Sequence, residues 1–388
     1  MKSEPIRLKL LILDLAIIVL FLGTITFLFK YVGFIDSKSH NSFLIDYLAK
    51  GYFPIPPGYY FTIYVVDLFI RIKYPYVVSS ILILTFFYWW KYKLVYKWIA
   101  HSLNIKKKLV FLITLSFLFV SPIYIPIIDG EFWYLGKFTQ TIWHNSTLIC
   151  VFPLCILLTH YTLRWVEDPL LKTLYIMGVI GILILLIKPS FLFCYIPALP
   201  LYVIVKDRKL SKHFFESLGL VLVLFLLILA EKYLIFSWDP MIDQLYTVEE
   251  RSNVVIRPFR VWLFFSHEPV FDFISSFPLL LTFLIFWRKE AFHINFFNFT
   301  LILLLFSLLV FFLLAETGYR EFHSNFYWQV PIALFLNSLS ILIHVLREFT
   351  ASENNLKIKY IAVFSIYTVQ VLLGVGYWAR IFIERTLS

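Results

Sequence analysis

The chain has 388 residues, of which 61% are hydrophobic, 20% aromatic and only 15% charged. Soluble domains carry about 45–50% apolar and about 25% charged residues, so this composition excludes a soluble enzyme, a disordered chain and a nucleic-acid-binding domain. The formal net charge of +10 does not change this conclusion, because Lys and Arg residues of a membrane protein mainly report its topology. The sequence predicts a protein that crosses a membrane many times.

Apolar stretches of the length of a membrane helix recur along the whole chain. The first, residues 10–29, follows the basic residues Lys2, Arg7 and Lys9 and lacks a small-residue cleavage site, so we expect a first span with its amino end inside. Ten more stretches follow, at residues 76–90, 109–128, 147–163, 173–187, 191–205, 217–236, 276–287, 296–315, 327–346 and 360–379. All eleven are predicted to be helices, because a backbone in lipid must satisfy its own hydrogen bonds and these stretches lack the alternation of barrel strands.

The charges between these stretches predict the topology. Most Lys and Arg residues fall in turns that an eleven-span arrangement places inside, such as residues 106–108 and 206–212, whereas most acidic residues fall on the opposite side. This alternation obeys the positive-inside rule and predicts an inner amino terminus and an outer carboxyl terminus in a cytoplasmic membrane. The sequence contains no internal repeat and no separate soluble domain, so residues 1–388 are expected to form one integral membrane domain.

The first outer loop, residues 34–75, contains a segment that does not fit a span. Residues 58–72 are apolar, but the segment is short and includes Asp67 and Arg71. If it crossed the membrane, every later turn would change sides and the charge rule would fail. We therefore expect two helices lying in the outer interface, residues 40–50 and 58–72, joined by the proline-rich residues 52–58.

Nearly every unusual polar residue falls on the predicted outer side, and this asymmetry points to chemistry at that face. The candidate site residues lie in five outer segments: Asp36 and His40; Glu131, Trp143, His144 and Asn145; Lys188; Arg257 and Arg260; and Glu316, Arg320, His323 and Asn325. Aromatic side chains such as Trp143 suit sugar faces, although anchoring at the membrane interface explains them equally well.

Several of these residues also have plain structural explanations. Lys188, followed by a proline, either extends its ammonium to the membrane surface or binds a phosphate or carboxylate. Glu316 and Arg320 have the spacing of a helix-end ion pair. His144 is either a base or ligand or a hydrogen-bonding residue at a helix start, and Asn145 opens a glycosylation sequon.

No P-loop, dinucleotide-binding, HExxH or GxSxG motif occurs in the chain. ATP-driven transport by this chain alone is therefore not expected. The cofactor is left open: a divalent cation would require Asp129 and Glu131 to converge with Asp36, and no motif indicates it.

The order of elements in the first outer loop resembles the membrane glycosyltransferases of the GT-C fold, which use polyprenyl-linked sugars. The resemblance rests on a first span, an early Asp36, an amphipathic helix, the turn Pro56-Pro57-Gly58 and a second interfacial helix. In that family an acidic residue of the first outer loop acts as catalytic base or holds the acceptor, and Asp36 is the matching position. The chain departs from the family in lacking an Asp-x-Asp pair in this loop and a large outer soluble domain.

A narrower resemblance covers roughly residues 1–345. Gly136, the segment Trp143-His-Asn-Ser-Thr147, the segment Lys188-Pro-Ser-Phe191 and residues 316–326 are similar to those of bacterial multi-pass membrane proteins associated with surface polysaccharide synthesis. Both resemblances imply a role in building the cell envelope.

The leading hypothesis is a GT-C-like glycosyltransferase that moves a sugar from a polyprenyl-phosphate-type donor to a glycan or lipid acceptor at the outer face of the membrane. Asp36, His144 and Glu316 are the expected catalytic residues, and the other candidates are expected to bind substrate. A polysaccharide polymerase or ligase is the alternative enzyme, although such proteins tend to gather Arg and His in one or two large loops. A lipid or glycan transporter, which places polar residues near the bilayer midplane, and a non-catalytic scaffold also remain as alternatives.

Overall fold

The computed structural model describes residues 4–33, 35–72, 74–245, 247, 250–352 and 357–387. Lys2 and Phe34, which mark the predicted amino-terminal charges and the start of the outer loop, lie outside these ranges. In chain order the elements are α1 (Glu4–Tyr31), α2 (Asp36–Ala49), α3 (Gly58–Ile70), α4 (Val77–Ser102), α5 (Lys107–Phe117), α6 (Pro126–Asp129), α7 (Ser146–Glu167), α8 (Leu171–Ile187), α9 (Ser190–Asp207), α10 (Lys212–Tyr233), η1 (Leu234–Trp238), α11 (Pro240–Leu245), β1 (Val254–Ile256), α12 (Arg260–Phe265), α13 (Pro269–Ser276), α14 (Pro278–Ala291), α15 (Asn295–Leu313), β2 (Leu314–Glu316), η2 (Gly318–Arg320), α16 (Gln329–Ala351) and α17 (Ile358–Glu384).

The protein is an almost entirely helical, multi-pass membrane protein. Each of the eleven predicted stretches overlaps a helix, but within the described residues only seven helices are long and apolar enough to cross a membrane. These seven lie in α1, α7, α9, α10, α15, α16 and α17. The pair α13 and α14, bent by 65°, makes an eighth if it counts as one span. Among the described residues, helix length and composition thus support seven or eight spans, and the other three of the predicted eleven are not confirmed.

Two of the predicted stretches form helices that are too short to count as membrane spans, and the sequence shows why. The stretch at 109–128 is helical only as α5, because the chain leaves the helix after Phe117 and continues as irregular backbone to the short helix α6. Helix α8 is apolar throughout, but it ends at Ile187, before Lys188 and Pro189. Proline lacks the amide hydrogen that a continuing helix would need, so it separates α8 from α9.

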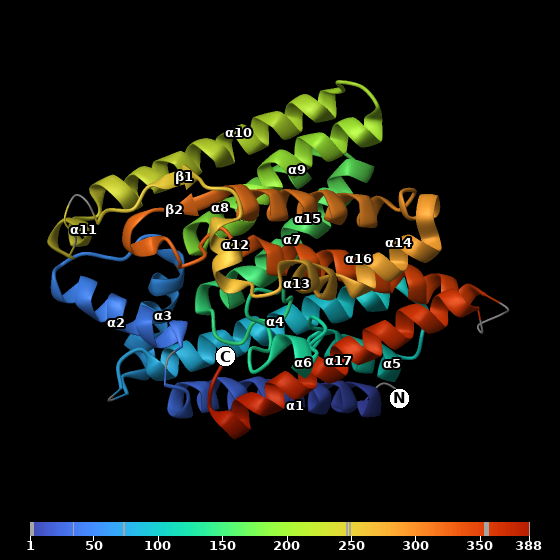
Figure 1. Cartoon of the computed structure of the whole chain (residues 1–388), viewed down its shortest axis with the longest axis horizontal. Helices are drawn as coiled ribbons and strands as arrows, with labels where there is room; N and C mark the ends of the chain where they lie inside the picture. The colour runs from blue at the N-terminus through green and yellow to red at the C-terminus, as the bar shows by residue number, and fades with distance from the viewer. Residues whose placement is uncertain are drawn as a thin grey trace.

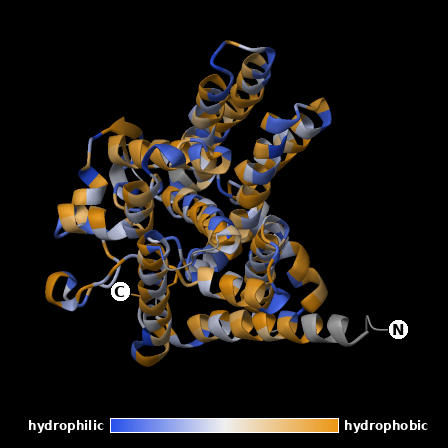
Figure 2. Cartoon of the chain, turned by 90° about the vertical axis from the view of Figure 1, so that its right-hand side faces the viewer, coloured by the Kyte–Doolittle hydropathy of each residue, from blue (hydrophilic) through white to orange (hydrophobic). Residues whose placement is uncertain are grey.

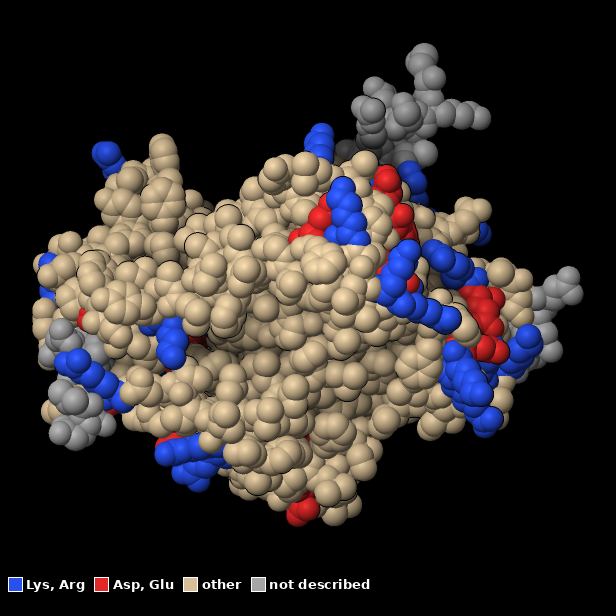
Figure 3. Space-filling view, turned by 90° about the horizontal axis from the view of Figure 1, so that it is seen from above, with Lys and Arg blue, Asp and Glu red and all other residues tan. Residues whose placement is uncertain are grey.

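The long helices run roughly parallel to one axis of the molecule (Figure 1). The start of α1, the turn between α9 and α10, the end of α16 and the start of α17 gather toward one end, whereas α2, α3, α11 and the two strands gather at the other. Charged side chains lie mainly toward the two ends, and the face between them is largely uncharged (Figure 3). Apolar residues cover outward as well as inward helix faces (Figure 2), as expected for a surface in contact with lipid.

Helices α7 and α16 form the centre of the bundle. In α16, 94% of the most apolar stretch is buried, and in α7 the corresponding share is 78%, whereas only 17% is buried in α10 and 22% in α17. Helices α4 and α8 pack on α7, and helices α9, α14 and α15 pack on α16.

The first outer loop contains two helices, as the sequence predicts. Helix α2 begins at Asp36, earlier than the predicted residue 40, and α3 ends at Ile70. Ser80 of α4 donates to Asn41 of α2 across 2.8 Å, which fixes α2 on the bundle. Asp67 accepts from the Tyr76 amide (3.0 Å) and the Ser79 hydroxyl (2.7 Å), so this acidic residue of the apolar helix caps the start of α4.

Gly58, the first residue of α3, allows α3 to approach the end of α8. A Cβ atom at this position would lie 2.7 Å from the Leu186 carbonyl oxygen and 2.9 Å from Ile187 Cγ1. A side chain at these distances would clash with α8, so only glycine fits at this position. This contact places α3 directly beside Lys188.

The structure contains a small antiparallel sheet, whereas the sequence predicts helices alone. Val254 pairs with Glu316, and Ile256 pairs with Leu314. Val254, Val255 and Ile256 are β-branched residues, which favour extended backbone. Gly318, with a φ of 63°, follows the sheet against the Glu250 carbonyl oxygen, where a Cβ would come within 2.3 Å. The sheet ties the loop after α11 to the end of α15 and fixes the position of Glu316.

Candidate functional site

The candidate site lies where the chain reaches the amino-terminal ends of α7, α9 and α16. Ser146 begins α7, Ser190 begins α9, and Gln329 begins α16. The amino-terminal end of a helix carries partial positive charge and unpaired N–H groups, so it favours anions. Side chains from four segments that are far apart in the sequence meet at these ends.

Asp36 is bound to the first turn of α7. The Ser146 backbone N–H and the Ser146 hydroxyl each donate to Asp36 Oδ2 across 3.1 Å. His40 Nε2 lies 3.2 Å from the same oxygen, and 31% of the Asp36 side chain is accessible. All recorded donors therefore reach Oδ2, which leaves Oδ1 as the oxygen available to a ligand.

The surroundings keep the Asp36 carboxylate ionised. Burial raises the pKa of Asp36, but the nearby His40, Lys188 and His144 lower it by more, so the pKa falls well below its usual range. The position at the amino-terminal ends of both α2 and α7 favours the same charged form.

Lys188 faces Asp36 from the junction between α8 and α9. Its ammonium donates to the Thr147 hydroxyl across 3.0 Å and lies 5.3 Å from the centre of the Trp328 ring. Burial lowers the pKa of Lys188 to about 8, against the opposing effect of Asp36. No ion pair or hydrogen bond among the described residues joins Lys188 to Asp36 directly. Each of these charges shifts the pKa of the other group, so Lys188 and Asp36 lie close to each other without a direct ion pair.

Glu316 and Arg320 form the third part of the cluster. Arg320 Nε lies 3.1 Å from Glu316 Oε1, as the spacing in the sequence predicts, and Asn325 donates to Glu316 Oε2 across 2.5 Å. Burial raises the pKa of Glu316, and Arg320, Asn325 and Lys188 partly offset that rise. Phe236 of η1 lies 5.2 Å from the Arg320 guanidinium and supports it from the opposite side.

His144 lies between Asp36 and the start of α16. Its ring centre is 6.2 Å from that of Trp328, and its backbone oxygen accepts from the Ser37 hydroxyl across 3.4 Å. Burial lowers the pKa of His144, and Asp36 opposes this only in part. The imidazole is therefore neutral near pH 7 and able to accept a proton.

The structure thus brings together Asp36, His40, His144, Lys188, Glu316, Arg320 and Asn325. The cluster contains two carboxylates, Asp36 and Glu316, and two cations, Lys188 and Arg320. Such an arrangement can hold a polar ligand by its hydroxyl groups at the Asp36 side and by a negative group at the Lys188 and Arg320 side.

Other sequence-predicted candidates lie elsewhere. Glu131 is exposed, and its backbone oxygen accepts from Arg380 of α17. Arg257 and Arg260 are about half exposed and both pair with Glu321. His323 is exposed. Partial desolvation and the positive charge of the nearby Arg320 both lower the pKa of its imidazole.

Trp143 and Asn145 have structural positions beside the cluster. The Trp143 ring is buried and stacks on Tyr88, with ring centres 5.4 Å apart, so it does not face outward as a platform for a sugar. The Asn145 side chain accepts from the Leu148 amide across 2.9 Å and caps α7. Both residues hold His144 and Ser146 in place.

Sequence reasoning missed Tyr60, Ser146, Thr147 and Trp328. Ser146 and Thr147 follow Asn145, a residue type that commonly precedes the first turn of a helix, and this signal could have placed them at the start of α7. Tyr60 contacts His40 Nδ1 across 2.5 Å, and nothing in its local sequence distinguishes it from Tyr59.

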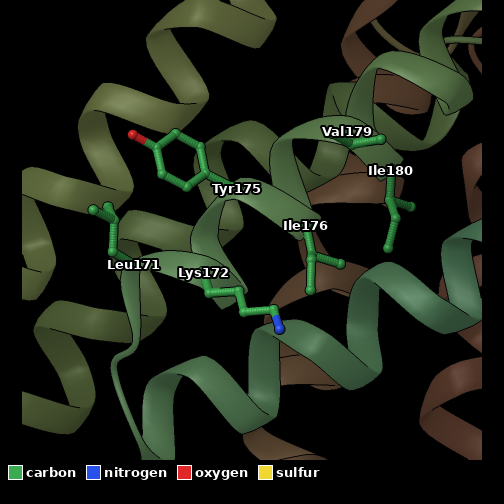
Figure 4. A pocket seen from close by; sticks show the side chains of 6 residues that line it. All are labelled: Leu171, Lys172, Tyr175, Ile176, Val179 and Ile180. Carbon is green, nitrogen blue, oxygen red and sulfur yellow. The ribbon is translucent and has the colours of Figure 1, made fainter.

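No group of three or more His, Cys, Asp or Glu side chains in the described part of the chain is arranged to hold a metal ion. A shallow, apolar groove lies along the first half of α8, lined by Leu171, Lys172, Tyr175, Ile176, Val179 and Ile180 (Figure 4). None of the cluster residues lines this groove, which lies toward the opposite end of α8 from Lys188.

No protein-family model matches the sequence, and a search of curated proteins also finds no match. The inference of function therefore rests on the site itself.

Proposed function

We propose that this protein is a membrane glycosyltransferase that transfers a sugar from a polyprenyl-phosphate-type donor to a glycan or lipid acceptor. The observation that carries the proposal is the placement of the Asp36 carboxylate, with Oδ1 available, opposite the Lys188 and Arg320 side chains. Glycosyl transfer from a lipid phosphate needs these two features in one place: an oxygen that receives the acceptor proton and cations that neutralise the departing phosphate.

The reaction forms a bond between the acceptor oxygen and the anomeric carbon and breaks the bond between that carbon and the phosphate oxygen. The acceptor hydroxyl donates to Asp36 Oδ1, which orients it and receives its proton as the new bond forms. The electron pair of the broken bond stays on the lipid phosphate. Lys188, Arg320 and the amino-terminal ends of α7, α9 and α16 stabilise the added charge.

Glu316 and His144 complete the site in this proposal. Glu316, held by Arg320 and Asn325, accepts hydrogen bonds from sugar hydroxyls. His144 is neutral and lies close to Asp36, so it is the second group able to relay the acceptor proton. A low pKa makes Asp36 a weak base, so it receives the proton only as the new bond forms and the acceptor oxygen becomes more acidic.

The proposal includes the finer membrane arrangement. The three additional predicted spans, which contain α4, α5 and α8, would complete an eleven-span GT-C-like fold in a cytoplasmic membrane. The amino terminus would then be inside, the site at the outer face and the carboxyl terminus outside. The helix arrangement agrees with this, because α2, α3 and the sheet gather at the end of the molecule opposite to the amino terminus (Figure 1).

The first experiment measures binding of farnesyl phosphate, a short polyprenyl monophosphate, to the purified protein in detergent. Wild type is expected to bind farnesyl phosphate but not farnesol, which has the same chain without the phosphate. The double variant Lys188→Met with Arg320→Met should lose this preference, whereas Arg257→Gln with Arg260→Gln should keep it. Equal binding of both lipids by wild type would contradict the proposal.

The second experiment distinguishes transfer from transport. The protein is reconstituted into vesicles with farnesyl-phosphate sugars and a mixture of candidate acceptor glycans. Release of farnesyl phosphate that depends on both Asp36 and acceptor supports the transferase. Movement of intact donor across the bilayer without cleavage would instead support the transporter alternative.

A further inference from the structure

The buried Tyr60 and the half-buried His40 form a pair behind Asp36. The Tyr60 oxygen lies 2.5 Å from His40 Nδ1, and His40 Nε2 lies 3.2 Å from Asp36 Oδ2. The three side chains thus make a continuous chain from α3 through α2 to the first turn of α7. Only 6% of Tyr60 is exposed, so Tyr60 does not contact the substrate in the proposed reaction.

The direction of these hydrogen bonds follows from the chemistry of the two ends. Burial raises the pKa of the Tyr60 hydroxyl well above its usual value, and the negative charge of Asp36 raises it further. The hydroxyl therefore stays protonated, and because His40 Nδ1 is its only hydrogen-bond partner among the described residues, it donates to that nitrogen. A donor at Nδ1 requires a lone pair there, so the neutral imidazole carries its proton on Nε2, which faces the Asp36 carboxylate.

We propose that Tyr60 is a positioning residue that holds the His40 proton on Nε2 and thereby fixes the Asp36 carboxylate with Oδ1 directed to the acceptor. This inference rests on the proposed function for its effect on turnover, but its effect on His40 is independent of that function. The same logic orients the histidine of a Ser-His-Asp triad, where a buried third group selects the tautomer.

The packing of α3 makes this arrangement rigid. The Tyr60 and His40 rings meet edge to face with centres 5.4 Å apart, and Tyr59 lies 5.5 Å from His40 on a second side. Gly58 anchors the start of the same helix against α8. A shift of α3 would therefore disturb both the Tyr60–His40 contact and the contact of Gly58 with the end of α8.

The test uses nitrogen-15 NMR of histidine-labelled protein in detergent, with the His40 signals identified by their loss in His40→Gln. Wild type is expected to show His40 with its proton on Nε2. Tyr60→Phe, which removes only the hydroxyl, should let a second proton bind at Nδ1, because no donor then faces that nitrogen while the Asp36 carboxylate still holds the Nε2 proton. Tyr367→Phe is the matched control, because it removes a hydroxyl that bonds to Ser116 on the other side of the bundle. A His40 signal that is the same in Tyr60→Phe and wild type would overturn the proposal, as would a doubly protonated His40 in wild type at pH 8.

A double-mutant cycle measures the consequence for turnover. Tyr60→Phe should lower kcat by about 10-fold to 100-fold with little change in KM, by analogy with the loss of other supporting partners. In His40→Gln the amide donates to Asp36 without a choice of tautomer, so Tyr60→Phe should have no further effect there. An equal loss in both backgrounds would show a merely structural role for Tyr60. If neither the wild type nor any variant turns over a sugar donor, the proposed function fails. If the NMR result nevertheless holds, the positioning of His40 by Tyr60 stands.

Discussion

Ser146 binds Asp36 twice, through its backbone N–H and through its hydroxyl, across 110 residues of sequence. The pair joins the first outer loop to the first turn of the buried helix α7. Because both bonds reach Oδ2, they hold the carboxylate in one orientation and bring it into the field of the helix end. The candidate site therefore depends on the helix start as much as on the acidic residue.

The first prediction concerns Asp36 itself. Asp36→Asn should reduce sugar transfer by about 100-fold or more, because the amide cannot accept the acceptor proton. The measurement is the initial rate of donor cleavage by purified protein. Asp46→Asn provides the control, since Asp46 lies on the same helix and is exposed. Full activity of Asp36→Asn would remove Asp36 from the mechanism.

The second prediction is a pH dependence of anion binding. The pKa of Lys188 is lowered to about 8 by burial, so its ammonium is present below about pH 8 and is lost as the pH rises through that value. Farnesyl phosphate affinity should therefore fall between about pH 7.5 and 9.5. The charged groups that face Lys188 are Asp36, Glu316 and Arg320.

Lys188→Arg should keep its affinity across this range, because arginine remains charged. Lys188→Met should bind about 10-fold to 100-fold more weakly at pH 7 and show no step near pH 8. Lys172→Met, at the other end of α8, should behave as wild type. A step that persists in Lys188→Met would assign the titration to a different group.

The third prediction concerns the pair of Glu316 and Arg320. Arg320→Met removes a cation of the site and leaves Glu316 buried beside Asn325, so we expect both weaker phosphate binding and lower stability, by about 1–3 kcal/mol. Arg257→Met, at an exposed ion pair, should change stability by less than about 1 kcal/mol. Thermal unfolding in detergent and farnesyl phosphate titration measure the two effects separately. Unchanged phosphate affinity in Arg320→Met would exclude this guanidinium from the anion site.

The fourth prediction is steric. Gly58→Ala should destabilise the protein by about 1–3 kcal/mol, because the new Cβ would collide with Leu186 and Ile187. Gly219→Ala in α10 should be neutral or stabilising by about 0.5–1 kcal/mol, since nothing lies within 4 Å of its added Cβ. Chemical or thermal unfolding compares the two. Similar stabilities would mean that α3 does not pack against α8 as described.

The fifth prediction tests the topology by cysteine labelling. The three native cysteines, Cys150, Cys155 and Cys194, are buried and are expected to react slowly. Asn253→Cys, before β1, should react with a membrane-impermeant maleimide in intact cells, whereas Lys209→Cys, between α9 and α10, should react only after the membrane is opened. The reverse pattern would invert the proposed orientation.

The sequence by itself determined the class of the protein and the places where helices form. Composition and the length of the apolar stretches are local properties. A backbone buried in lipid must satisfy its own hydrogen bonds, and it does so mainly by forming a helix. The two helices of the first outer loop, the break at Pro189 and the pairing of Glu316 with Arg320 also follow from residues close together in the chain.

Only the tertiary structure decided which polar residues share a site. Lys188 meets Thr147 and Trp328, and Asp36 meets Ser146, through packing between helices far apart in sequence. The same packing buries Trp143 and pairs Arg257 and Arg260 with Glu321, away from the cluster. Periodicity and charge describe one helix at a time, whereas the faces that two helices present to each other depend on the shapes of all their side chains.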